Sequence, residues 1–174
     1  MPARGSRHGS TVDLTFGEYL THYFPPILAL VPAAVMLWEP LISDAVLVRR
    51  GPAWAIAAVS LALSSLFFWI QTRALRFISI ATNRTAESNY AYALNALADA
   101  GWNVVHKSRN RRIVCSVAGF PRTMRSWGER VELRFKGNLV LVNSICDPDR
   151  TPALTAWGRN RDNVRRVIQM FAGI

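Results

Sequence analysis

Residues 52–70 read PAWAIAAVSLALSSLFFWI, a run of 19 residues without a charged residue or a glycine. At 1.5 Å per residue a helix of this length reaches about 28 Å, close to the ~30 Å hydrocarbon core of a bilayer. The polar side chains of the run are the serines Ser60, Ser64 and Ser65, whose hydroxyls can bond back to carbonyls of their own helix. A buried helix of a soluble protein would show a polar face, so the run predicts a transmembrane span.

A second apolar stretch, residues 23–43, precedes this run and predicts another span. Residues 23–38 and 54–69 have the same length, and each interval is bounded by aromatic rings of the kind that settle at the headgroup level. Two helices of matched length joined by a loop form a hairpin. Small residues four apart would let the two backbones approach closely, namely Ala29 and Ala33 on the first helix and Ala58 and Ala62 on the second. A signal peptide fits the first span poorly, because 22 residues precede it and no small-residue cleavage site follows.

Arginines near the spans orient this hairpin. Two lie before the first span and three after the second, against two in the connecting loop (Arg4, Arg7, Arg73, Arg76 and Arg84 against Arg49 and Arg50). Cytoplasmic flanks are enriched in Lys and Arg, so the sequence predicts a two-pass membrane protein with both termini cytoplasmic, in the inner membrane if the source is bacterial. The predicted organisation is an N-terminal cytoplasmic segment over residues 1–22, the hairpin over 23–70, and a basic cytoplasmic domain over 71–174.

The apolar pattern after the hairpin predicts a small α+β domain. Residues 83–100 repeat at helical spacing, with Thr85 or Asn83 as the N-cap and Gly101 just past the end. Four strand-like runs and a last helix follow, at residues 102–107, 112–118, 130–135, 139–146 and 161–172. We therefore expect a two-layer sandwich of helix, four-stranded antiparallel sheet and helix. We expect residues 73–80 to continue the second span as helix, and residues 83–174 to fold without the hairpin.

The net charge of +10 lies entirely after residue 72, where 17 Lys and Arg face 7 Asp and Glu. A basic residue near an anionic leaflet contributes roughly 1 kcal/mol of attraction, so lipid headgroups are the first expected partner. The residues expected to contact such a surface are Arg73, Arg76, Arg84, Arg159, Arg161, Arg165 and Arg166. An acidic protein and a second copy of the chain are further partners that the pattern allows. Nucleic acid is disfavoured, because neither interleaved strand aromatics nor a helix-turn-helix spacing is present.

Residues 120–127 join the second and third predicted strands and mix large apolar side chains with arginines. Phe120, Arg122, Arg125 and Trp127 are therefore a candidate partner-contact loop that could enter a membrane surface or a pocket. The alternative is that Phe120 and Trp127 fold back onto the core.

Three residues could carry chemistry: His106, Cys115 and Cys146. If Lys107 pairs with Arg112, His106 shares a face with Cys115, but the spacings match no zinc signature and no fourth ligand is evident. The favoured interpretation is two buried cysteines and a half-exposed histidine, with no cofactor. A Cys115–Cys146 disulfide becomes the leading alternative if the domain is extracytoplasmic.

These patterns favour a non-enzymatic accessory or regulatory subunit that displays a basic domain and binds a membrane-surface or protein partner. Two alternatives stay open. One is an immunity protein that guards the membrane against a toxin, and the other is an enzyme that uses Cys115 or His106.

Overall fold

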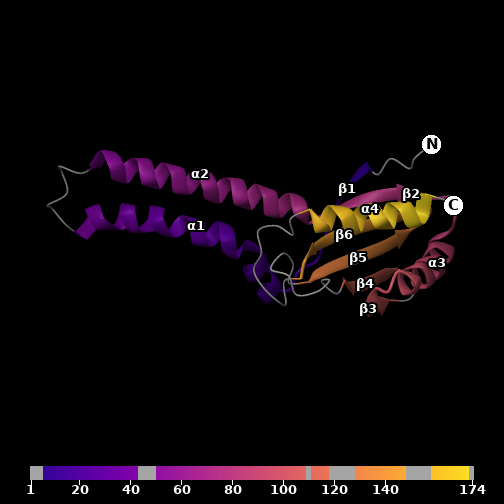
Figure 1. The fold of residues 1–174 in the computed structure, drawn as a ribbon. Helices are drawn as coiled ribbons and strands as arrows, with labels where there is room; N and C mark the ends of the chain where they lie inside the picture. Colours follow the sequence, from indigo (N-terminus) through magenta and orange to yellow (C-terminus); the bar gives the residue numbers. More distant parts are fainter. Residues whose placement is uncertain (1–5, 43–49, 109–110, 118–127, 148–157, 173–174) are drawn as a thin grey trace.

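The computed structural model describes residues 6–42, 50–108, 111–117, 128–147 and 158–172, arranged as a long helical hairpin that extends from one end of a curled sheet domain (Figure 1). In chain order the elements are β1 (Ser6–Thr11), α1 (Phe16–Ile42), α2 (Arg50–Ala74), β2 (Arg76–Ala81), α3 (Ala86–Asp99), β3 (Asn103–Ser108), β4 (Arg112–Val117), β5 (Glu129–Lys136), β6 (Leu139–Cys146) and α4 (Arg159–Ala172). The predicted helix–sheet architecture is confirmed in part, since the two long apolar helices, the four predicted strands and both shorter helices are present.

The sheet has six strands rather than the predicted four, in the order β1-β2-β6-β5-β4-β3, and every neighbouring pair is antiparallel. The expectation that residues 73–80 continue the second span is wrong, because α2 ends at Ala74 and β2 begins at Arg76. β6 is apolar on both faces, which is typical of a central strand, and β5 pairs with one of its edges. β2 pairs with the other edge, with Ile78 opposite Val142 and Ile80 opposite Val140.

The N-terminal segment adds the sixth strand. β1 pairs with β2 and brings residues 6–11 to the same sheet as the C-terminal half of the chain. Both sequence ends of the described chain therefore lie at the same end of the hairpin, away from the connection between α1 and α2 (Figure 1).

Two apolar cores lie on opposite faces of the sheet. The larger one packs α3 and α4 against inward side chains such as Ile80, Leu133 and Val142, which are fully buried. The predicted local signals hold here: the Thr85 hydroxyl caps α3 by accepting from the Ser88 N–H at 3.3 Å, and Gly101 follows the helix with φ +70°.

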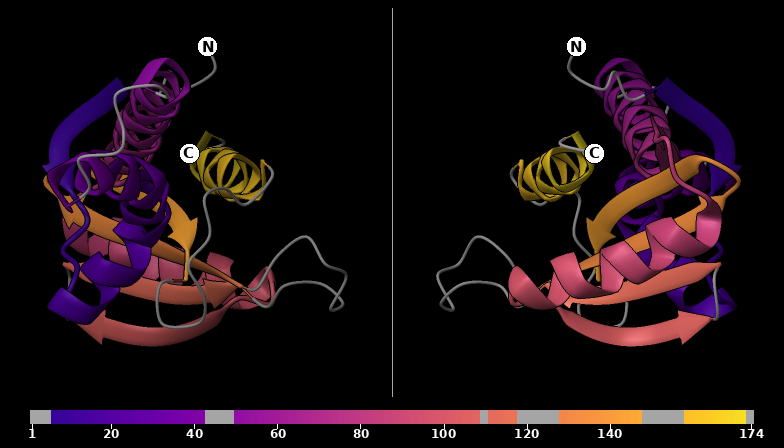
Figure 2. Two further views of the ribbon diagram at one scale, coloured as in Figure 1. Left: turned by 90° about the vertical axis from the view of Figure 1, so that its left-hand side faces the viewer. Right: turned by 90° about the vertical axis from the view of Figure 1, so that its right-hand side faces the viewer.

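The smaller core joins the sheet to the end of the hairpin at which α1 begins and α2 ends. It gathers Tyr23 of α1 and Leu75 with Phe77, Leu141 and Ile145 of β2 and β6. Tyr23 is only 5% exposed, so this ring packs in protein rather than marking the outer end of α1. The sheet curls strongly (Figure 2), and its second face therefore meets the first turns of α1 and the last turn of α2.

Candidate functional site

The two long helices contact each other mainly through small and polar groups, with one contact between the rings of Tyr23 and Phe68, whose centroids lie 5.0 Å apart. Ala33 and Ala57 are 2% and 3% exposed, and the Ser64 hydroxyl donates to the Pro26 carbonyl at 2.8 Å. Nearer the sheet, the Tyr23 and Thr72 hydroxyls lie 3.1 Å apart. Of the predicted small-residue pairs, Ala33 lies in the contact, whereas Ala58 and Ala62 are exposed on the outer side of α2. The small stripe of α2 is instead Ala57, Ser60 and Ser64.

The outer faces of the same helices carry large apolar side chains. Phe24, Leu28 and Val35 on α1 are about half exposed, as are Leu66 and Trp69 on α2. Phe16–Met36 and Trp54–Ala74 are long and apolar enough to cross a membrane by length and composition, and 22% of each window is buried. A core helix of a soluble protein would be mostly buried, whereas these helices expose most of their large apolar side chains.

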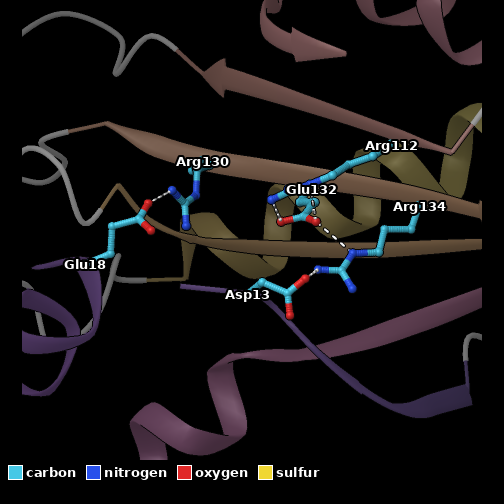
Figure 3. A network of polar contacts seen from close by, with 6 residues as sticks. All are labelled: Asp13, Glu18, Arg112, Arg130, Glu132 and Arg134. Carbon is cyan, nitrogen blue, oxygen red and sulfur yellow. Dashed lines mark hydrogen bonds and ion pairs between the residues drawn. The ribbon is translucent and has the colours of Figure 1, made fainter. Parts of the chain in front are cut away.

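α1 begins seven residues before the predicted span, at a capping box. The Thr15 hydroxyl accepts from the Glu18 N–H at 3.4 Å, and a Glu18 carboxylate oxygen accepts from the Thr15 N–H at 2.6 Å. The second Glu18 oxygen pairs with the Arg130 guanidinium of β5 (Figure 3). The helix start is thereby tied to the sheet.

A charged network continues from this pair along the second sheet face (Figure 3). Arg112 and Arg134 both contact Glu132, at 2.7 and 2.8 Å, and Arg134 also pairs with Asp13 at 2.9 Å. A pocket of about 310 Å³ beside it is lined in part by His106, Arg112 and Arg130. Because these arginines are each paired with a carboxylate, the pocket holds no excess positive charge.

The exit of α2 is fixed by one side chain of β6. The Asn143 amide donates to the carbonyls of Ala74 and Arg76 at 2.7 and 2.9 Å, which satisfies a helix-end carbonyl that the helix itself leaves unpaired. Leu75 between them is 6% exposed and packs into the smaller core. The turn from helix to strand is therefore rigid.

Two arginines from the predicted anionic-surface set flank this turn. The Arg73 guanidinium lies over the Trp69 ring at 4.9 Å from the centroid, and Arg76 begins β2. Both are exposed, and in the described part of the chain neither forms an ion pair. Trp69, Thr72, Arg73 and Arg76 line a pocket of about 270 Å³.

The other members of that set lie elsewhere. β2 carries the chain about 17 Å away from Arg76 before Arg84, which stacks on the Tyr92 ring at 4.7 Å. On α4, Arg159 pairs with the buried Glu129 at 3.2 Å and Arg165 with Asp162 at 3.4 Å. Arg161 and Arg166 are exposed and, among the residues that the structure describes, have no carboxylate partner. The candidate contact loop of Phe120, Arg122, Arg125 and Trp127 lies outside the described residues.

The structure does not place the side chains of His106, Cys115 and Cys146 in one cluster, although His106 and Cys115 both line the pocket of about 310 Å³. A bulge at Val105 shifts the register by one residue, so His106 pairs with Val114 and lies on the face opposite Cys115. β5 separates the two cysteines, Cys115 facing Val131 and Cys146 facing Glu129. Two strand spacings amount to about 9–10 Å, beyond the reach of a disulfide.

Cysteine chemistry is further restrained by burial. Cys115 is 0% exposed, and burial raises the pKa of its thiol to about 12. Burial also raises the pKa of the Cys146 thiol. Over the described ranges, no group of three or more His, Cys, Asp or Glu side chains is placed to hold a metal ion.

Sequence reasoning missed the residues that join the hairpin to the sheet. The Thr15-x-x-Glu18 pattern just before an apolar run is a capping-box signature and places the helix start at Phe16. Asn143 and the Arg130 pairing carried no such signal, because both depend on contacts across more than 60 residues. Comparisons with protein-family models, curated proteins and solved structures found no match to this chain.

Proposed function

We propose that this chain is a two-pass membrane protein that holds a basic sheet domain at the cytoplasmic surface, as a non-enzymatic accessory or regulatory subunit. The observation that supports membrane insertion is the distribution of side chains on the two long helices. Small and polar groups such as Ala33, Ala57 and Ser64 lie between the helices, and large apolar side chains face outward. Helix pairs in lipid pack through small residues and hydrogen bonds, since lipid tails already surround the large apolar groups.

The sheet topology supports an even number of crossings. β1 precedes the hairpin and β2 follows it, and the two strands pair in one sheet. A chain that crosses twice returns to the side on which it started, as this pairing requires. The excess of arginine on that side favours the cytoplasm.

The binding role is supported by arginines that have no carboxylate partner among the described residues. Arg73, Arg76, Arg161 and Arg166 are exposed, which leaves them available to an anionic lipid or an acidic protein face. A cysteine enzyme is less well supported, because a thiol with a pKa of about 12 is almost wholly protonated at neutral pH and thiolate is the nucleophile.

Extraction and topology experiments test this proposal. The full chain is expected to stay with membranes at alkaline pH and to be released only by detergent. A reporter fused after Ile174 is expected to be cytoplasmic, and one inserted near Asp44 extracytoplasmic. Release by alkali would refute membrane insertion, and protease access to the sheet domain from outside sealed cells would refute the orientation.

A further inference from the structure

We infer that Trp69, Thr72, Arg73 and Arg76 form a binding site for the phosphate group of an anionic lipid headgroup. The inference rests on the proposed membrane location and goes further, since it replaces a diffuse basic surface with one defined pocket. Its volume of about 270 Å³ is just below that of drug-sized ligand sites and suits a headgroup fragment.

The first argument is charge. Arg73 and Arg76 place two guanidinium groups at one pocket, and the described part of the chain offers neither of them a carboxylate. The pocket with Arg112 and Arg130 differs, because both of its arginines are paired with Glu132 and Glu18. Of the two pockets, the one beside Trp69 therefore has the uncompensated charge.

The second argument is donor geometry. Arg73 lies with its guanidinium over the Trp69 ring, which holds the group through its face. The N–H groups of a guanidinium point outward in its plane, so the contact through the ring face can leave N–H groups of Arg73 available for two-point contact with phosphate oxygens. Thr72 adds a hydroxyl: when Tyr23 donates to Thr72, the Thr72 proton remains for a further acceptor.

The third argument is rigidity. Asn143 holds the carbonyls on both sides of Leu75, and the Leu75 and Phe77 side chains are buried at 6% and 0% exposure. The backbone between Arg73 and Arg76 is therefore fixed before any ligand arrives, which lowers the ordering cost of binding. The Asn143 amide also satisfies a helix-end carbonyl that would otherwise oppose an anion.

The fourth argument is depth. Trp69 is 55% exposed near the sheet end of the apolar α2 segment, and exposed tryptophan concentrates at the headgroup level of membranes. A phosphodiester of a lipid in the same leaflet lies at that level, which favours a lipid over a soluble phosphate as the ligand.

Binding to the full chain in neutral detergent tests the site without requiring a bilayer. The probes are a short-chain phosphatidylglycerol, the matching phosphatidylcholine and inorganic phosphate, measured by native mass spectrometry and by titration. The variants are Arg73→Gln/Arg76→Gln and, as the matched control, Arg161→Gln/Arg166→Gln, which removes the same charge from exposed positions on α4. Retention of the wild-type melting transition confirms that each variant is folded.

We expect the wild type to bind the anionic lipid in preference to the neutral one. The Arg73/Arg76 variant should bind it about tenfold or more weakly, since a charge-assisted hydrogen bond corresponds to about that factor. The control should change affinity less than about twofold, because neither Arg161 nor Arg166 lines the pocket. Equal losses in both variants, or no loss in the first, would overturn the site. Displacement of the lipid by millimolar inorganic phosphate would overturn the lipid source. Release of the chain from membranes by alkali would refute the proposed function and leave this binding result standing.

Discussion

The ion pair between Glu18 and Arg130 is the contact whose removal should most directly loosen the hairpin from the sheet. Glu18 begins α1 and Arg130 lies on β5, 112 residues later in the chain. The pair can be separated from the helix cap, because glutamine at position 18 can still complete a capping box with Thr15. Glu18→Gln therefore removes the charge alone, and Arg130→Met removes the guanidinium and keeps much of its apolar volume.

The size of the effect follows from burial. The Glu18 and Arg130 side chains are 10% and 14% exposed. The Nε and Nη2 atoms of Arg130 are buried and have no hydrogen-bond partner among the described residues. Breaking a fully buried pair costs about 3–5 kcal/mol, so we expect about 2–3 kcal/mol for either single variant here. At about 2–4 °C per kcal/mol for a chain of this size, the Tm should fall by about 4–12 °C. The double variant should lose less than the sum of the two, since it leaves no unpaired buried charge.

Thermal unfolding of the full chain in mild detergent measures these shifts. Arg165→Gln is the control: its pair with Asp162 is exposed at 57% and 60%, and such pairs contribute about 0–1 kcal/mol. Amide hydrogen exchange in the first turn of α1 should rise in the single variants and not in the control. The pair would be shown not to hold the hairpin to the sheet by either of two results. One is a Tm of the single variants equal to that of the control, and the other is a loss of stability in the double variant equal to the sum of the two single losses.

Three further predictions follow from burial and topology. Ala33→Leu should destabilise the helix pair by about 1–3 kcal/mol through overpacking, whereas Ala58→Leu, on the outer face, should be neutral in a detergent melt; equal effects would contradict the contact. Cys115 should resist alkylation in the native chain at pH 8, because a pKa of about 12 leaves about 10⁻⁴ of the thiol ionised, and it should react once the chain is unfolded. Rapid labelling of the native chain in a C146S background would contradict the burial of Cys115. A fragment of residues 83–174 should lack a cooperative thermal transition, contrary to the expectation from sequence alone, because it loses β2 with the buried side chains of Phe77 and Ile80. Adding back residues 71–82 should restore cooperative folding, and a sharp transition without these residues would contradict the need for β2.

Local periodicity determined most of the elements. The uncharged run at residues 52–70 lies within α2, and alternating or helical spacing located β3 to β6, α3 and α4 to within a few residues. Signals of this kind are carried by neighbours in sequence. The N-cap at Thr85 and the left-handed Gly101 were predictable for the same reason, since a cap and a helix end involve residues three to five apart.

Tertiary structure decided where those elements meet. Residues 73–80 have a composition that suits a helix leaving a span, but the helix ends at Ala74 and β2 begins at Arg76. β2 forms by pairing along one edge of β6, a contact between residues more than 50 positions apart in the chain. β1 pairs with β2 in turn. One bulged residue, Val105, turned His106 away from Cys115, which no periodicity could reveal because a shift by one residue reverses every face.

The candidate site shows the same division. The sequence by itself determined that positive charge follows the second apolar helix, and it named Arg73, Arg76 and Arg84 alike. The structure separates them, because the chain changes from helix to strand at Leu75: Arg73 and Arg76 stay beside Trp69, whereas β2 carries Arg84 away. Which charges share a pocket depends on where the backbone turns, and that turn is held by Asn143, whose amide comes from a strand 69 residues later.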